Sequence, residues 1–290
     1  MRSISLFLLL ASVTMVAAQK RKPPSSFNRI NAANTQFLEK QWWLGLKAGV
    51  SFSGTVVQQP YSGLSPVNYT APQKNYDNFA QPGFVVLMEA AFSYRRFTVA
   101  FQPGYRNARF DYQTFYLWTD YQNPDNRLEL QYGQQQRVEY ADFPLLVRFD
   151  ATTTRLRPYI QAGVYYAHLI QAAKTIQVTG TDYASGGINV FAQPPVKVGA
   201  TELFATTHYG LIAGAGASLH SGNVRFSFDI QYRKGMSLAN STSNRYANTR
   251  LNSFGDVMDD IHINSVLFSL GTIFPLKFLS KSFQSVTQRP

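Results

Sequence analysis

Apolar and polar residues alternate with a period of two in eight separate segments of the chain, and this alternation predicts half-buried β-strands. In the clearest segment, Val224, Phe226 and Phe228 alternate with Arg225 and Asp229. The predicted strands cover residues 44–53, 84–93, 97–106, 140–149, 159–166, 210–219, 224–233 and 265–274. Most are close to the ~9–11 residues that a tilted strand needs to cross a bilayer.

The first 18 residues have the pattern of a secretory signal. Arg2 supplies a positive start, the run from Ile4 is apolar or small, and Val16-Ala17-Ala18 resembles a cleavage site. Residues 19–41 are polar, basic at their start and interrupted by Pro23-Pro24, which predicts a tail. No later apolar run reaches about 18 residues, so we expect no transmembrane helix.

The connections between the predicted strands alternate between short and long. Tight turns lie around residues 94–96, 151–157 and 221–223, and long polar connections cover 54–82, 107–137, 171–207 and 235–260. This asymmetry is typical of outer-membrane barrels. We therefore predict an all-β fold: an eight-stranded antiparallel up-and-down transmembrane β-barrel over residues 42–278. It would have short periplasmic turns, long extracellular loops, a basic periplasmic tail over 19–41 and a C-terminal periplasmic extension over 279–290.

A soluble β-sandwich would also give alternating strands, but its outer faces meet water and tolerate many charges. Here only 15% of residues are charged, whereas 14% are aromatic. The polar faces of the predicted strands carry Gly, Ser and Gln with a few opposite charges, as expected of a crowded barrel interior. Closure of the barrel also removes sheet edges, which lipid cannot satisfy. The chain has no cysteine, which excludes disulfides and cysteine-ligated metals.

The formal net charge of +11 suggests an anionic partner. An exported chain has little access to nucleic acid, so we expect no nucleic-acid partner. Most of the basic excess falls in the tail, the short turns and the C-terminal extension. This distribution predicts contact with lipid phosphates, an acidic protein or a cell-wall polymer in the periplasm. The residues expected to make that contact are Lys20, Arg21, Lys22, Lys277, Lys281 and Arg289.

Strand alternation directs a set of charged side chains into the predicted barrel. An eight-stranded barrel has just enough interior for its own side chains, so we expect these charges to neutralise one another in a network that plugs the barrel. A narrow gated path or an internal ligand site is the alternative. The eight residues are Lys47, Glu89, Arg106, Asp142, Arg148, Arg225, Asp229 and Arg233.

Aromatic residues gather where the predicted strands meet turns or loops, as in the two interfacial girdles of membrane barrels. Residues 112–121 (YQTFYLWTDY) are unusually aromatic for a predicted loop. Packing over the barrel mouth and contact with a partner would each account for them. The predicted interfacial residues are Trp42, Trp43, Tyr94, Tyr105, Tyr166 and Tyr209.

Four histidines are the main candidates for chemistry, and His168 and His208 would end and begin neighbouring strands at the outer rim. Some barrel enzymes, such as the lipid A palmitoyltransferase, carry Ser and His groups at this rim. No HExxH metal motif or glycine-rich phosphate loop is present. We therefore predict no catalytic residue, no metal site and no cofactor.

Several strand motifs resemble the PorT-like outer-membrane β-barrel family of Bacteroidota. The segment Tyr140-Ala141-Asp142-Phe143-Pro144-Leu145-Leu146, followed by Arg157-Pro158-Tyr159 and Gly163, is similar to that family's central hairpin. Residues 43–49 (WLGLKAG) resemble its opening strand, and residues 214–216 and 228–232 its sixth and seventh. The founding member of the family is implicated in type IX secretion and gliding-associated export, so the resemblance implies an accessory role in protein export.

These observations predict a largely plugged outer-membrane barrel that acts as a structural or interaction component of an envelope assembly, together with outer-membrane lipids and protein partners. Two alternatives remain open at this stage. One is a narrow channel or small-ligand carrier, and the other is a lipid-modifying enzyme at the barrel rim.

Overall fold

A computed structural model describes residues 40–61, 74–252 and 257–276 of the 290-residue chain. The predicted signal (1–18), the tail up to residue 39 and the predicted extension (279–290) lie outside the described residues. The six basic residues expected to contact an anionic partner lie outside them as well. None of the described helices is long and apolar enough to cross a membrane.

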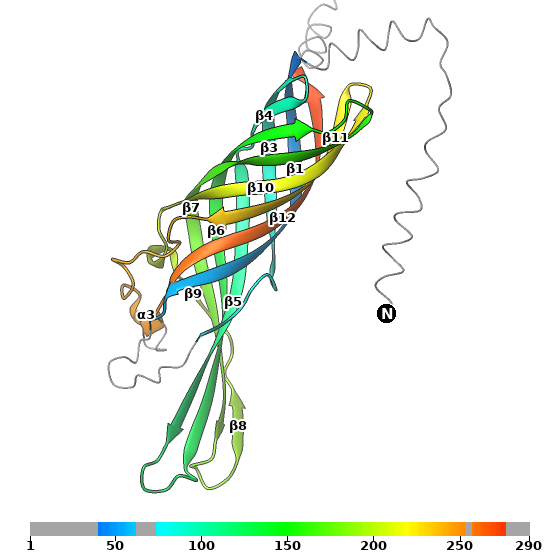
Figure 1. Ribbon diagram of the computed structural model, residues 1–290. Helices are drawn as coiled ribbons and strands as arrows, with labels where there is room; N and C mark the ends of the chain where they lie inside the picture. The colour runs from blue at the N-terminus through cyan, green and yellow to red at the C-terminus, as the bar shows by residue number, and fades with distance from the viewer. Residues whose placement is uncertain (1–39, 62–73, 253–256, 277–290) are drawn as a thin grey trace, which may run out of the picture. The chain divides into compact units, whose positions relative to one another are not determined.

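The described residues form one closed antiparallel barrel (Figure 1). Its strands are β1 (Lys40–Gln59), β3 (Pro82–Tyr94), β4 (Phe97–Phe101), β5 (Gly104–Thr119), β6 (Arg127–Asp150), β7 (Leu156–Asp182), β10 (Thr207–Ser221), β11 (Val224–Gly235) and β12 (Asp260–Pro275). With β4 and β5 counted as one strand, each strand pairs with the next along the barrel, and β12 pairs back with β1 from Trp43↔Pro275 to Gln59↔Asp260. All eight predicted strands are present, so the predicted fold class is confirmed.

Strands β4 and β5 together make one barrel strand, because both pair with β3 on one side and β6 on the other. The interruption lies at Gln102 and Pro103, since proline has no N–H to donate to a ladder. The ladder continues across the break, where the Met88 N–H donates to the Pro103 carbonyl at 2.8 Å. The predicted strand over 97–106 is therefore a single barrel strand with a local irregularity.

Buried and exposed side chains alternate along the barrel strands, most regularly on β3 and β11. On β3, Leu87, Glu89 and Ala91 are buried, whereas Val86 and Met88 are exposed on the outside. The outward side chains form an apolar belt, and the inward ones are largely polar and charged. This arrangement is the reverse of a soluble protein, and lipid contact is its physical reason, because hydrocarbon accepts apolar side chains and excludes charges.

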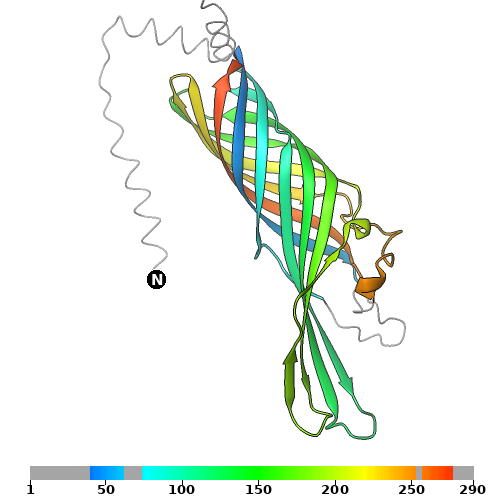
Figure 2. The ribbon, with the colours of Figure 1, turned by 180° about the vertical axis from the view of Figure 1, so that it is seen from behind.

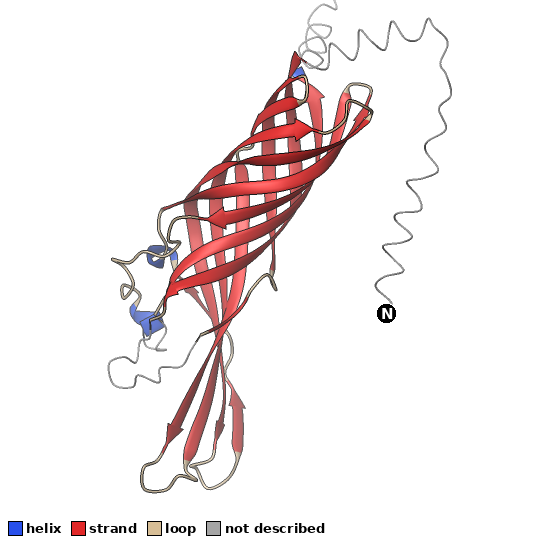
Figure 3. Ribbon diagram, in the orientation of Figure 1, coloured by secondary structure: helices blue, strands red, loops and turns tan. Residues whose placement is uncertain are grey.

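The two ends of the barrel differ. The turns at residues 95–96, 151–155 and 222–223 lie at one end, here called the turn end, together with Trp43 of β1 and Pro275 of β12. The longer connections lie at the opposite end, here called the loop end. They include β2 (Asn75–Asp77), which pairs with β5, the 3-10 turn η1 (Thr201–Leu203) and the short helix α3 (Thr249–Asn252). Figure 3 shows these short helices outside the barrel wall.

Two of the four predicted long loops are in fact strands. Residues 107–137 continue β5 and β6 with an unbroken ladder from Gly104↔Asp142 to Thr119↔Arg127, leaving only a short turn. Residues 171–207 continue β7 to Asp182 and add β8 (Asn189–Ala192) and β9 (Val196–Gly199), which both pair with β7. The prediction of loops was wrong here because Gln, Tyr and Thr are common in these strands, and such residues suit a strand with water on both faces.

A sheet therefore continues past the barrel at the loop end (Figures 1 and 2). It consists of the ends of β5, β6 and β7 together with β8, over residues 113–134 and 176–193, and is called the arm below. A β-bulge lies between the barrel and the arm, where Glu139 pairs with Gln171 but Tyr140 pairs with Leu169. The extra residue, Ile170, shifts the inward side chains of β7 from odd to even positions, because a bulge changes which face a strand presents.

Candidate functional site

A cluster of four charged side chains fills the middle of the barrel. Lys47 Nζ lies 2.6 Å from Glu89 Oε2 and 2.6 Å from Asp229 Oδ2. Arg148 contacts the same two carboxylates, at 3.3 Å and 3.8 Å. The four residues come from β1, β3, β6 and β11, and all are at most 1% exposed. Two cations thus face two anions across the barrel, and no net charge is left in this cluster.

Neutral side chains also donate hydrogen bonds to the two carboxylates of this cluster. The Tyr159 hydroxyl donates to Asp229 Oδ1 at 2.6 Å, and the Gln161 amide donates to the same oxygen at 3.1 Å. Gln102 donates to Glu89 Oε2 at 2.6 Å. Buried charges need partners of this kind, because an unsatisfied buried charge is strongly destabilising.

A second cluster lies nearer the loop end. The Asp142 carboxylate accepts hydrogen bonds from Arg106 Nε at 2.7 Å and from Arg233 Nη1 at 2.6 Å, so it bridges two guanidinium groups. Arg106 also lies over the Tyr140 ring at 4.9 Å, and Arg233 lies over the Tyr165 ring at 5.6 Å. Contact with ring faces stabilises the cations where carboxylates are too few.

Arg225, the last of the eight predicted interior residues, lies apart toward the turn end. It donates Nε–H to His220 Nε2 at 2.8 Å and lies over the Trp43 ring at 4.1 Å. No carboxylate of the described residues is within 4.0 Å of it. All eight predicted residues are therefore buried, and seven form ion pairs with one another. Their clusters interrupt the barrel lumen at more than one level.

The predicted interfacial aromatics lie on the outside of the barrel, with one correction. Trp42, Tyr94, Tyr166 and Tyr209 are exposed, and Tyr105 is partly exposed next to Phe84, with ring centroids 5.3 Å apart. At the turn end, Trp42 packs on Phe92 at 5.2 Å.

Trp43 is the exception, because only 1% of its surface is exposed and its ring lies inside the barrel beneath Arg225. Its assignment to the outer girdle was wrong for a simple geometric reason. Successive residues of a strand point to opposite faces, so Trp42 and Trp43 cannot both face lipid.

The two histidines considered for catalysis are neighbours in the sheet but point in opposite directions. His168 pairs with Thr207, so His208 is one position away across the β7–β10 ladder. His168 is exposed, whereas His208 is buried and bonded to the Tyr165 hydroxyl at 3.0 Å and to Ser237 Oγ at 2.9 Å. A shared catalytic role at the rim does not fit this arrangement.

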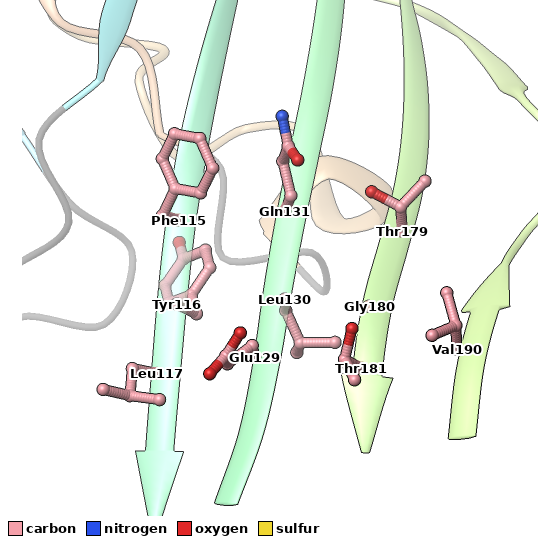
Figure 4. Close-up of a pocket in the computed structure, with 10 residues that line it drawn as sticks. All are labelled: Phe115, Tyr116, Leu117, Glu129, Leu130, Gln131, Thr179, Gly180, Thr181 and Val190. Carbon is pink, nitrogen blue, oxygen red and sulfur yellow. The ribbon is translucent and has the colours of Figure 1, made fainter. Parts of the chain in front are cut away.

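The arm carries a groove that the alternation pattern of the barrel strands did not predict. Its cavity volume is about 480 Å³, and Figure 4 shows the residues that line it on four adjacent strands. Phe115 and Leu117 come from β5, Glu129 and Gln131 from β6, Thr179 and Thr181 from β7, and Val190 from β8. The only sequence signal for this region was the aromatic segment 112–121, which forms the end of β5 and the start of the turn after it.

These features define the protein as an integral β-barrel of the outer membrane: a closed barrel with an apolar belt outside and paired charges inside. The family described as Outer membrane protein beta-barrel domain matches residues 17–254, and the chain belongs to it. A search of curated proteins finds no match.

Solved structures of outer-membrane barrels are similar at low identity. OprG from Pseudomonas aeruginosa is 12% identical, with a TM-score of 0.38 over 82% of this chain and 97% of that chain. Neisserial surface protein A is 12% identical, with a TM-score of 0.30 over 80% and 96%. The attachment invasion locus protein Ail of Yersinia pestis, solved with the heparin analogue sucrose octasulfate, is 9% identical, with a TM-score of 0.28 over 81% and 99%.

Proposed function

We propose that the protein is a membrane anchor that displays the arm to a protein partner, as an interaction component of an envelope assembly. The observation that carries this proposal is the continuation of β5, β6 and β7 past the barrel into a sheet with exposed apolar side chains. Leu117 is 67% exposed, Val190 74% and Phe115 52%. An exposed apolar surface of this kind marks an interaction site.

The filled interior supports an anchor rather than a channel. The cluster around Lys47 and Asp229 and the cluster around Asp142 are both buried, and each occupies a different level of the lumen. Passage of a solute would require breaking these buried ion pairs, which is costly in a low-dielectric interior. The channel alternative predicts that Arg148→Ala or Asp229→Ala changes conductance in a planar bilayer. The anchor proposal predicts no conductance for the wild-type protein.

The orientation that fits this role places the turn end and both termini in the periplasm and the arm outside the cell, as for barrels with short periplasmic turns. The basic tail and C-terminal residues, including Lys20 and Lys277, would then meet lipid phosphates or an anionic periplasmic partner. An accessory role in protein export, implied by the resemblance to the PorT-like family, is one form of such an assembly.

Removal of the arm tests the proposal. Residues 114–132 and 177–193 are each replaced by a two-residue Asn-Gly turn, which is compatible with a β-hairpin. The shortened barrel should still insert in the outer membrane, as judged by its heat-dependent mobility on gels. Proteins that co-purify with the full chain after gentle detergent extraction should be lost. If the same proteins co-purify with both forms, or if the full chain purifies alone, the proposal is wrong.

A further inference from the structure

The groove of the arm is built from two rows of side chains that cross the sheet. Cross-strand pairing aligns Phe115, Gln131 and Thr179 in one row. Leu117, Glu129, Thr181 and Val190 form the next row. Directly opposed residues of antiparallel strands share a face, so all these side chains belong to the same face of the arm.

The rows give the groove apolar walls and a polar floor. Phe115 and Leu117 stand on β5 and Val190 stands on β8, whereas the side chains that β6 and β7 add to these two rows are polar (Figure 4). Adjacent strands are about 4.8 Å apart, so the walls are separated by roughly 14 Å. This width accepts one extended peptide lying along the strands above β6 and β7. Its apolar side chains would reach the walls on β5 and β8.

The charge of the arm is opposite to that of the whole chain. The chain carries +11, but the arm has four carboxylates, Asp120, Asp125, Glu129 and Asp182, against the single cation Arg127, a net charge of −3. Glu129 is the carboxylate that lines the groove. Its side chain is 49% exposed and pairs with Arg127 at 3.0 Å, so an incoming cation can reach it from solvent.

We infer that the groove binds an extended, basic segment of the partner protein, with apolar residues against Phe115, Leu117 and Val190 and a Lys or Arg against Glu129. This inference rests on the proposed function and specifies the chemistry of its partner. The floor residues Gln131, Thr179 and Thr181 supply hydrogen-bonding groups for the backbone of such a segment. A segment that contains both Lys and Val residues has both features, since Val supplies apolar contacts and Lys supplies a cation.

A glycan fits the groove less well. Carbohydrate sites stack sugar rings on flat aromatic faces, and Phe115 is the single aromatic side chain of this face that lines the groove. Tyr183 continues the same face beyond the groove, where Arg127 lies over its ring at 4.2 Å. Tyr116 lines the groove as part of β5 but belongs to the opposite face, where its ring packs on Tyr132 at a centroid distance of 5.1 Å. The negative charge favours a basic peptide directly.

The test uses the full chain in detergent and a fluorescent peptide of four Lys-Val repeats, with a Glu-Val peptide of equal length as the control ligand. Fluorescence anisotropy should show saturable binding of the Lys-Val peptide and no binding of the Glu-Val peptide. Glu129→Gln and Leu117→Ser should each weaken binding about fivefold, equivalent to roughly 1 kcal/mol. Asp125→Asn removes an equal charge from the tip turn outside the groove, and Ile188→Ser removes an exposed apolar side chain outside it. Both should leave the affinity unchanged.

Equal losses in Glu129→Gln and Asp125→Asn would mean non-specific attraction to the acidic arm and would overturn the inference. Binding of a neutral oligosaccharide that depends on Phe115, with no binding of the Lys-Val peptide, would overturn it in favour of a glycan. Heat-dependent mobility of every variant identifies losses that come from misfolding. If deletion of the arm removes partners but Glu129→Gln and Leu117→Ser do not, the groove inference fails while the proposed function stands.

Discussion

Lys47 and Asp229 are 182 residues apart in the sequence, yet Lys47 Nζ and Asp229 Oδ2 lie 2.6 Å apart in the centre of the barrel. Their strands, β1 and β11, are not neighbours, because β12 lies between them. The contact therefore crosses the inner face of β12 and does not run along one ladder. Because β1 reaches β11 only through its ladder with β12, this interior contact forms when the barrel closes.

Replacing the cation of this contact should destabilise the whole barrel. Lys47→Met leaves Glu89 and Asp229 buried with only Arg148 to neutralise them, and breaking a buried ion pair typically costs about 3–5 kcal/mol. Urea unfolding in lipid vesicles, followed by tryptophan fluorescence, measures the loss. Lys197→Met replaces an exposed lysine on β9 and should leave the unfolding midpoint unchanged. A Lys47→Met barrel as stable as the wild type would contradict the assigned role of the cluster.

The opposite orientations of Trp42 and Trp43 can be measured directly. The chain has three tryptophans, so two double variants leave one each: Trp43→Phe with Trp118→Phe keeps Trp42, and Trp42→Phe with Trp118→Phe keeps Trp43. Lipids brominated on their acyl chains should quench the fluorescence of Trp42 strongly and that of Trp43 weakly, because Trp42 faces outward and Trp43 lies under Arg225. Equal quenching would place both rings in the lipid.

Gly49 lies where the first and last strands meet, and closure depends on its size. A Cβ atom added there would sit 1.9 Å from the Phe268 carbonyl oxygen of β12, and that backbone atom cannot move aside easily. Gly49→Ala should destabilise the closed barrel by roughly 1–3 kcal/mol, the usual cost of overpacking. The fraction that refolds into vesicles, read from gel mobility, measures this. Ala48→Val on the exposed lipid-facing side of the same strand is the matched control and should refold normally.

The pairing of β2 with β5 should strengthen as the pH falls. Burial raises the pKa of Asp111, and Asp77, directly opposite it on β2, acts in the same direction. The Gln81 amide, which donates to Asp111 at 2.6 Å, and Arg109 oppose this shift. A carboxyl whose pKa is raised on folding disfavours the folded state when ionised. The penalty is present above the raised pKa and is relieved as the pH falls through it.

Hydrogen exchange of the Asn75–Asp77 amides, corrected for intrinsic rates, reports on this pairing. Protection should increase between neutral pH and the pH at which Asp111 becomes protonated. Asp111→Asn, which has a similar shape and no charge, should show high protection that does not change over the same range. An unchanged pH dependence in Asp111→Asn would assign the effect to another group.

The barrel wall could be predicted from sequence because each strand presents a local pattern. Alternation along residues 224–233 is enough to assign Arg225 and Asp229 to the inside and Phe226 and Phe228 to the outside. The same rule, applied at Trp43, would have avoided the one error among the aromatics. The arm was missed because both of its faces are mixed. Phe115 and Glu129 lie on one face, and no periodic contrast marks a strand with water on both sides.

The sequence by itself determined the strands, their inward and outward faces, and the eight charges that enter the barrel, because these depend only on the period of a pleated chain. The tertiary structure decided which charges meet. Asp142 bridges Arg106 and Arg233, whereas Arg225 lies over Trp43 without a carboxylate within 4.0 Å among the described residues. It also decided that β5, β6 and β7 leave the barrel together as an arm. Pairing between strands far apart in the chain depends on register and closure, and these are properties of the whole sheet.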